Sequence, residues 1–282
     1  MAAVSASMVK ELRERTGLGM MDCKKALEEV GGDMDAAIEH LRKSSGMKAA
    51  KKAGRIASDG IIGVKVEGGK GIMVEVNCET DFAAGGEDFG AFVATVTNKV
   101  FETGTADVAA LDLEDTREKL VQKIGENVSI RRAEVLTDAD TVVEYLHTNG
   151  KIGVLLSMSG GSVDLGRDIA MHIAAMSPTV VSPEEAPQDL IAKEREIYTA
   201  QAQESGKPAE IIEKMIDGRI RKYLAEISLT EQPFVKDGDV KVGALLKKAG
   251  ATINSFTRYE VGEGIEKVED DFAAEVQKQL GG

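Results

Sequence analysis

An internal repeat places the strongest constraint on how this chain can fold. Residues 62–67 and 72–77 alternate apolar and polar side chains on either side of a Gly-rich turn, which predicts a β-hairpin. Residues 142–147 and 152–157 repeat this pattern at an offset of 80 residues. Self-similarity of this kind indicates two copies of one supersecondary unit.

The repeat extends into the helices that follow, and each half has a later strand. A helical stripe follows each hairpin, and the two stripes align at the same offset without a gap. The aligned residues are Phe89, Phe92, Val93 and Val96 in the first half and Ile169, His172, Ile173 and Met176 in the second. Further strands are expected at 128–134 and 253–261. The predicted fold class is α+β, with two repeated core subdomains, each an antiparallel sheet covered by helices on one face.

The two ends of the repeat are flanked by helical segments of a different kind. Three short helices are expected between about Ser5 and Lys43, followed by a basic linker at 48–55. Residues 187–227 predict two charged helices with a tight turn between them, an antiparallel coiled-coil hairpin inserted into the second half. The expected domains are therefore 1–55, a core subdomain at 56–140 and a second at 141–282.

Charge and cysteine content limit the class of protein. The chain has 282 residues and a net charge of −13, which argues against a protein that wraps nucleic acid. The first 55 residues are instead slightly basic, which suits either an acidic partner surface or a solvated helical face. Two cysteines, Cys23 and Cys78, and an N-terminus without a targeting pattern predict a cytoplasmic protein with no membrane association.

Motifs for ordinary enzyme chemistry are missing from the sequence. No Gly-Lys pair has the spacing of a phosphate-binding loop, and no Ser-His-Asp or Cys-His set can be assembled. The three histidines lack the spacing of a metal site. His172 lies on an apolar stripe and is expected in the core, whereas His147 suits an interface and a plain surface position equally. We therefore expect no cofactor, no metal and no active site.

Two short segments are candidates for contact with a partner. Phe82 follows Asp81 in a turn after a buried strand, so its ring either folds back into the local core or is offered to another molecule. Met20 and Met21 open a helix after a Gly-rich turn. Because two adjacent residues cannot both face one small core, one of these methionines is expected to be exposed.

Six blocks of the sequence resemble the bacterial translation elongation factor Ts family. They occur in the family's order and span nearly the whole chain. The blocks are 9–27 (VKELRERTGLGMMDCKKAL), 48–54 (KAAKKAG), 75–82 (EVNCETDF), 123–127 (KIGEN), 170–175 (AMHIAA) and 260–267 (EVGEGIEK). One departure from the family's pattern is the small-residue run at 83–86, which is expected to loosen the positioning of Phe82.

The resemblance implies a guanine nucleotide exchange factor for elongation factor Tu, in its GDP-bound and nucleotide-free forms. It implies a ubiquitin-associated-like (UBA-like) N-terminal bundle, a two-part core and a coiled-coil hairpin. By similarity, the segment that enters the GTPase near its Mg²⁺ consists of Thr80, Asp81, Phe82 and Ala83. Further matching contact positions are Lys10, Arg13, Met20, Met21, Lys51, Ile124, Gly125 and His147.

Two other functions are compatible with the residues alone. A binding scaffold without exchange activity would use the basic N-terminal bundle to capture another protein or a ribosomal surface. An unrecognised enzyme would show turnover or ligand binding by the isolated chain, and the sequence gives this class little support.

Overall fold

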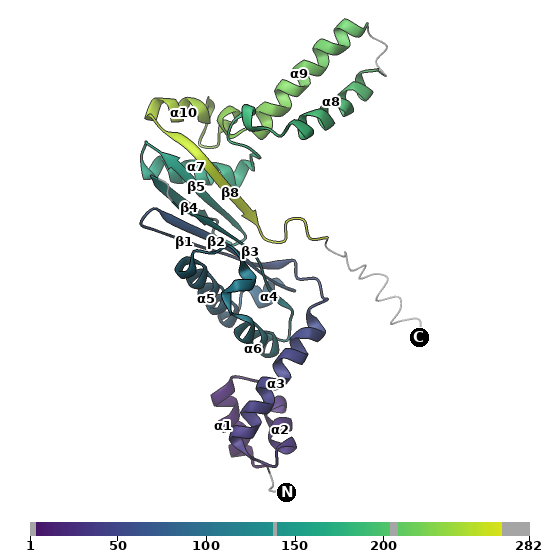
Figure 1. Ribbon diagram of the computed structural model, residues 1–282, viewed down its shortest axis with the longest axis vertical. Coiled ribbons are helices and arrows are strands. Elements are labelled where there is room, and N and C mark those ends of the chain that lie inside the picture. Colours follow the sequence, from purple (N-terminus) through teal and green to yellow (C-terminus); the bar gives the residue numbers. More distant parts are fainter. Residues whose placement is uncertain (1–3, 138–139, 204–207, 267–282) are drawn as a thin grey trace.

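The computed structural model describes residues 4–137, 140–203 and 208–266 (Figure 1). A helical bundle lies at one end of the long axis, two stacked sheets with their helices form the middle, and a helical hairpin extends at the other end. The three helices of the bundle are α1 (Ala6–Thr16), α2 (Met20–Glu29) and α3 (Met34–Lys52). Their shared apolar core includes Leu12, Cys23, Ala26, Leu27, Ala37 and Leu41.

Helix α3 is longer than the sequence predicted. The segment expected as a basic linker from residue 48 onward is helical to Lys52, and the prediction of a linker there is wrong. Ser45 and Ala49 lie one turn apart on the same face and are only 2% and 1% exposed. Ala49 packs into the core of the first half, so α3 joins the bundle directly to the sheets. The basic side chains occupy the other faces of the same helix.

The first half is a three-stranded antiparallel sheet with helices on its outer face. Its strands are β1 (Asp59–Glu67), β2 (Lys70–Cys78) and β3 (Val128–Leu136), in the order β1-β2-β3. The turn between β1 and β2 consists of two glycines with positive φ, as the two-residue hairpin requires. The helical segments between β2 and β3 are α4 (Asp81–Ala84), α5 (Glu87–Thr103), the 3₁₀ turn η1 (Val108–Leu111) and α6 (Glu114–Ile124).

The second half repeats this arrangement, which confirms the repeat predicted from the sequence. Its strands are β4 (Thr141–Leu146), β5 (Ile152–Ser159) and β8 (Thr252–Glu260), in the order β4-β5-β8. Helices α7 (Val163–Met176) and α10 (Val242–Ala249) complete the unit. As in the first half, the second strand of the hairpin is central. The aligned stripes are buried apart from Met176, which is 45% exposed at the end of α7.

His172 is a core residue, as the sequence predicted. Its ring is fully buried, with Nε2 2.9 Å from the Gln232 side-chain oxygen, and Nδ1 accepts a hydrogen bond from the Val235 backbone N–H at 3.2 Å. The proton of the neutral ring therefore sits on Nε2. Burial lowers the pKa of His172 despite the hydrogen bond to Gln232, so the ring is neutral at physiological pH.

The two sheets pack against each other through the faces that their helices leave open. Ile62 and Met73 of the first sheet contact Val142, Leu155 and Tyr259 of the second in one buried cluster. The sequence predicted the helix-covered faces but not this contact. Burial on both faces explains why β2 and β5 are almost continuously buried along their length.

Glycines allow this close approach of the sheets. A Cβ atom at Gly71 would lie 2.5 Å from Cγ1 of Val142, and one at Gly153 would lie 2.6 Å from Cγ2 of Ile62. Both distances are below van der Waals contact, so side chains at these positions would push the sheets apart.

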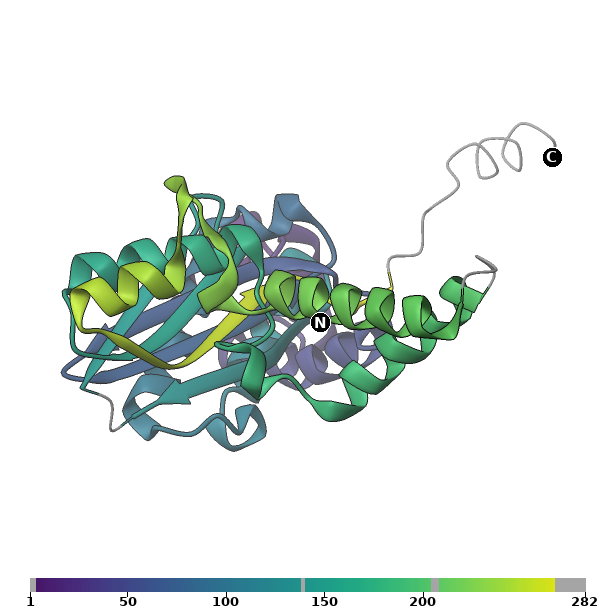
Figure 2. The same cartoon turned by 90° about the horizontal axis from the view of Figure 1, so that it is seen from above.

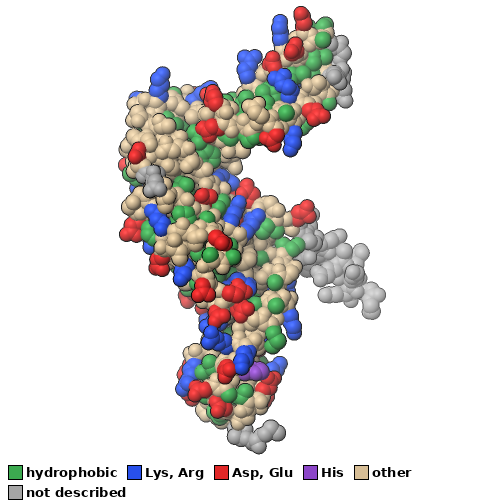
Figure 3. Space-filling view, in the orientation of Figure 1, with side chains coloured by type: hydrophobic (Ala, Val, Ile, Leu, Met, Phe, Trp, Pro, Cys, Tyr) green, Lys and Arg blue, Asp and Glu red, His purple; other side chains and the backbone are tan. Residues whose placement is uncertain are grey.

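The helical hairpin consists of α8 (Gln188–Gln203) and α9 (Ala209–Ile227), and it extends away from the sheets (Figures 1 and 2). Its small apolar seam is separate from the other cores and includes Ile191, Tyr198, Ala202, Ile212, Ile216, Ile220 and Leu224. Charges of both signs are interspersed over the visible face of the hairpin (Figure 3). The predicted turn at 205–207 lies outside the described residues, and Pro208 is the N-cap of α9. Among the described helices, none is both long and apolar enough to cross a bilayer.

The hairpin is joined to the second half by a short hydrogen-bonded base. The backbone N–H groups of Leu229 and Thr230 donate to Val180 and Val181, and that of Thr179 donates to Ile227, at 2.8 to 3.0 Å. The remaining segments near this base are η2 (Pro183–Glu185), η3 (Leu229–Glu231), β6 (Pro233–Phe234) and β7 (Asp237–Lys241).

Deletion of the hairpin is expected to leave a folded protein. Replacing residues 188–226 by a short Gly-rich linker removes the separate apolar seam but keeps Ile227 and the hydrogen bonds of the base. The shortened chain should therefore still unfold in one cooperative transition when melting is followed by circular dichroism. Loss of a cooperative transition would show that the hairpin is part of the core.

Candidate partner-binding site

The Phe82 turn, residues 79–84, follows the central strand of the first sheet. β2 ends at Cys78, and the four-residue helix α4 begins at Asp81. Thr80 caps this helix, because its hydroxyl accepts a hydrogen bond from the backbone N–H of Ala83 at 3.2 Å. The turn therefore has a defined backbone at the end of a buried strand.

The Phe82 side chain projects into solvent from this turn. Its relative exposure is 90%, the highest among the exposed large apolar side chains of the described residues. Ala83 and Ala84, which follow it, are buried in the core of the first half and hold α4 against the sheet. Asp81, beside the ring, is exposed as well. Of the two alternatives for Phe82, folding back into the local core is therefore wrong.

The Cys78 thiol supports the turn and is not a nucleophile. Its Sγ atom lies 3.2 Å from the carbonyl oxygen of Thr80. Burial, together with the negative charges of Glu126 and Asp59, raises the pKa of Cys78 to about 12. The thiol is therefore protonated at neutral pH and donates its proton to the Thr80 carbonyl.

A second group of predicted contact residues lies on the N-terminal bundle. Met20 and Met21 are 59% and 61% exposed, and with Lys10 and Arg13 they line a cavity of about 480 Å³. The sequence predicted that one of the two methionines would be exposed. Both are, because the buried face of α2 begins only at Cys23. This group forms an apolar surface with a basic rim.

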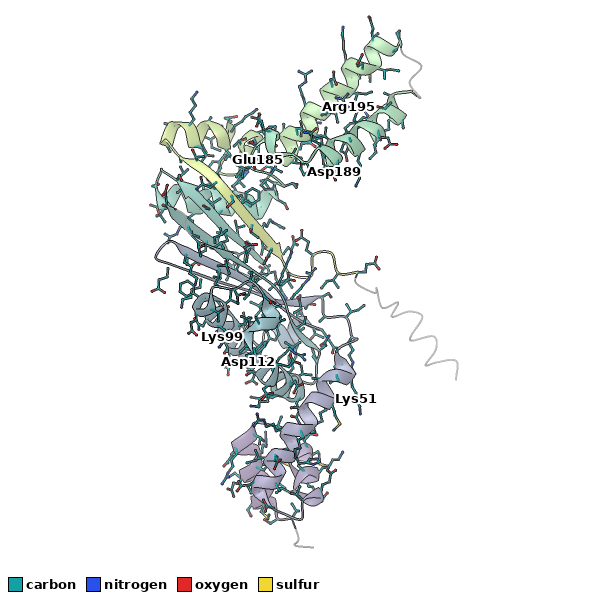
Figure 4. All side chains as sticks on the ribbon, in the orientation of Figure 1. Lys51, Lys99, Asp112, Glu185, Asp189 and Arg195 are labelled. Carbon is teal, nitrogen blue, oxygen red and sulfur yellow. The ribbon has the colours of Figure 1, made fainter. Side chains whose placement is uncertain are left out.

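A third group lies where α3 and α6 end. Ile124 is half-buried, and Gly125 follows it with a positive φ of 80°, which ends α6. The Lys52 ammonium group donates a hydrogen bond to the carbonyl oxygen of Gly125. The neighbouring Lys51 is exposed in the last turn of α3 and points away from the body of the protein (Figure 4).

His147 lies at the same end of the core as the Phe82 turn. It is exposed just after β4, with Nδ1 3.1 Å from the Tyr145 hydroxyl. Lys151, in the same β4–β5 turn, forms a 3.1 Å salt bridge with Asp59. Asp59 in turn pairs with Cys78, the last residue of β2. The structure thus brings His147 to the end of the core from which the Phe82 turn projects.

Two acidic residues for which the sequence predicted no role complete this region. Glu79 immediately precedes Thr80, and Glu126 immediately follows Gly125. Their mutual contacts join segments 46 to 48 residues apart, which no local pattern reveals. The only sign of their role in the sequence is that each is adjacent to a predicted contact residue. Among the described residues, no group of three or more His, Cys, Asp or Glu side chains could hold a metal ion.

Comparison with known proteins gives a consistent result across the whole chain. The family model described as Elongation factor TS matches residues 79–263. The chain is 62% identical over 287 residues to Elongation factor Ts of Hahella chejuensis, covering 100% of both chains. It is 58% identical over 284 residues to Elongation factor Ts of Saccharophagus degradans, covering 99% of this chain and 98% of that one. This chain therefore belongs to the elongation factor Ts family.

Proposed function

We propose that this chain is a guanine nucleotide exchange factor that acts on elongation factor Tu during translation elongation. It binds the GDP-bound GTPase, disturbs the Mg²⁺ and phosphate site, and so releases GDP and allows GTP to bind. Membership in the elongation factor Ts family supports the exchange activity. The observation that carries the mechanism is the 90% exposed ring of Phe82 on a fixed turn.

In this proposal the Phe82 turn enters the GTPase between two helices near the bound Mg²⁺. Thr80 and Ala83 hold the turn, while Asp81 and Phe82 make the intrusion. A GTPase binds GDP largely through its phosphates and Mg²⁺, so displacing the groups that support them favours the empty form. The GTPase supplies the nucleotide site, and this chain supplies no active site, cofactor or metal.

The energy required shows that one side chain is not enough. A thousandfold acceleration of GDP release requires about 4 kcal/mol. Burial of one Phe side chain contributes about 1.5 to 3 kcal/mol. Additional contacts must therefore stabilise the complex in the state that has lost GDP. We assign them to Lys10, Arg13, Met20, Met21, Lys51, Ile124, Gly125 and His147.

The domain organisation fits a protein that holds its partner at several places. We propose a UBA-like module at 1–55, core subdomains at 56–140 and 141–282, and a coiled-coil insert at 187–227. The exposed methionine surface on the first module and the Phe82 turn on the core are separate contact areas. Because α3 joins them as one continuous helix, the partner meets a preorganised pair of surfaces.

The reciprocity of coupled binding provides a test of this function. If the chain weakens GDP binding to Tu, GDP must weaken binding of the chain by the same factor. Gel filtration of the chain with nucleotide-free Tu should give a stable complex, and excess GDP with Mg²⁺ should dissociate it. A complex that persists unchanged in GDP and Mg²⁺ would support a scaffold without exchange activity.

A further inference from the structure

The Glu126 carboxylate binds the start of the Phe82 turn with both of its oxygens. Oε2 accepts hydrogen bonds from the backbone N–H groups of Glu79 at 3.1 Å and Thr80 at 3.0 Å. Oε1 accepts a third hydrogen bond from the Thr80 hydroxyl at 2.7 Å. The same hydroxyl accepts from Ala83 and caps α4. One carboxylate from a distant loop thus contacts the two residues immediately before Asp81.

Glu79 makes the reciprocal contact to the loop that carries Glu126. Its Oε1 atom accepts a hydrogen bond from the Asn127 backbone N–H at 2.6 Å, and its Oε2 atom lies 3.4 Å from Nη1 of Arg55. The Asn127 side chain donates to the carbonyl oxygens of Arg55 at 2.8 Å and Ala53 at 3.4 Å. Three segments meet here: the end of α3, the Phe82 turn and the loop after α6.

These contacts matter because the Phe82 ring has almost no packing of its own in the free protein. A side chain that is 90% exposed is oriented by its backbone rather than by its neighbours. A helix of four residues is too short to be stable in isolation, so α4 depends on its cap and on the burial of Ala83 and Ala84. Glu126 holds the residue that provides the cap.

We propose that Glu126 is a positioning residue for nucleotide exchange, which holds the Phe82 turn in the conformation that enters the GTPase. This inference rests on the proposed exchange function. Preorganisation removes the cost of ordering the turn at the step in which it enters the nucleotide site, so it increases the rate at which a bound factor releases GDP. Because Asn127 and Arg55 belong to the same network, the orientation of the turn is also linked to the end of α3.

Substitutions at position 126 separate geometry from charge. Glu126→Ala removes all three hydrogen bonds. Glu126→Asp keeps the charge but withdraws the carboxylate by one methylene group, and Glu126→Gln keeps an oxygen that can accept from both backbone N–H groups. Glu102→Ala, an exposed carboxylate near the end of α5, is the matched control.

The rate of GDP release from Tu at saturating factor is the measurement. We expect Glu126→Ala and Glu126→Asp to be about tenfold slower than the parent, Glu126→Gln to remain within about threefold, and the control to be unchanged. Parent-like rates for Glu126→Ala and Glu126→Asp would overturn the proposal. A parent-like rate for Glu126→Asp with a slow Glu126→Gln would also overturn it, because charge alone would then explain the effect.

A double-mutant cycle with Phe82→Ala tests whether Glu126 acts through the ring. Without the ring, only Asp81 remains to be oriented by the turn, so Glu126→Ala should slow Phe82→Ala by clearly less than the roughly tenfold expected in the parent. An equal slowing in both backgrounds would assign Glu126 a general structural role and overturn the proposal. Absence of any acceleration by the parent chain would instead refute the exchange function itself.

Discussion

Phe82→Ala is expected to slow GDP release from Tu by about 10- to 150-fold without destabilising the free protein. The ring is 90% exposed in the free chain, so its removal creates no cavity and breaks no packing. In the complex, the lost burial corresponds to about 1.5 to 3 kcal/mol, which gives this range of rates. The expected signature is a large loss of exchange with an unchanged thermal melting curve.

Stopped-flow release of fluorescent GDP from Tu measures this effect directly. Val163→Ala is a suitable control, because Val163 is a 48% exposed apolar residue at the start of α7, outside the proposed contact residues. It should exchange at the parent rate. If Phe82→Ala exchanges as fast as the parent and binds Tu equally well, the ring is not the group that opens the nucleotide site.

Glu75→Ala is expected to lower the free energy of unfolding at pH 7 by about 3 kcal/mol. The Glu75 carboxylate is fully buried in β2, 2.9 Å from Nη1 of Arg131 and 2.6 Å from Nε of Arg132. It also accepts hydrogen bonds from the Gly262 backbone N–H at 2.8 Å and the Asn77 side chain at 3.0 Å. This carboxylate ties the segment after β8 to the central strand of the first sheet.

The size of this loss in the free energy of unfolding depends on the two arginines that lose their contact with the Glu75 carboxylate when it is removed. Both arginines are partly exposed and can be rehydrated, which places the cost near the lower end for breaking a buried ion pair. Urea unfolding of parent and variant measures the difference. Glu67→Ala, at the exposed end of β1, should change the free energy of unfolding by less than about 0.5 kcal/mol. An equally small change for Glu75→Ala would contradict the role of this carboxylate.

The difference in the free energy of unfolding between the parent and Glu75→Ala should depend on pH. Burial raises the pKa of Glu75, but the hydrogen bonds from Gly262, Asn77, Arg131 and Arg132 outweigh burial and hold the pKa below its usual value. The ionised Glu75 side chain therefore contributes its full stabilisation of the folded protein above the pKa of an unfolded glutamate, about 4.3. This contribution is lost as pH falls through the lower pKa that Glu75 has in the folded state. The difference between parent and Glu75→Ala should narrow below about pH 4. A difference that widened on acidification would reverse this sign.

The sequence predicted the parts of the fold that depend on local periodicity. The two hairpins, the aligned helices and the later strands follow from alternation, helical stripes and turn residues. The extent of α3 was missed, because its buried face beyond Leu41 is formed by the small residues Ser45 and Ala49 rather than by large apolar ones. The stacking of the sheets through Gly71 and Gly153 was missed because it depends on contacts between the halves.

The candidate site could be predicted only in part, because it too depends on contacts between segments that are distant in the sequence. The unusual position of Phe82 in a turn was visible, but its exposure depends on whether Ala83 and Ala84 fill the core below it. The carboxylates of Glu79 and Glu126 acquire a role only when two distant loops meet. Residue types therefore indicated where contact with a partner is expected, and the fold shows which hydrogen bonds fix the geometry of the turn.

We propose above all that this chain uses a fixed, exposed aromatic ring to remove GDP from a partner GTPase. The most direct test is the rate at which purified Tu releases fluorescent GDP in the presence of Mg²⁺, with increasing concentrations of the 282-residue chain. We expect a rate that rises to a plateau about a thousandfold above spontaneous release. A release rate that stays at the spontaneous value, at concentrations where the chain demonstrably binds Tu, would contradict it.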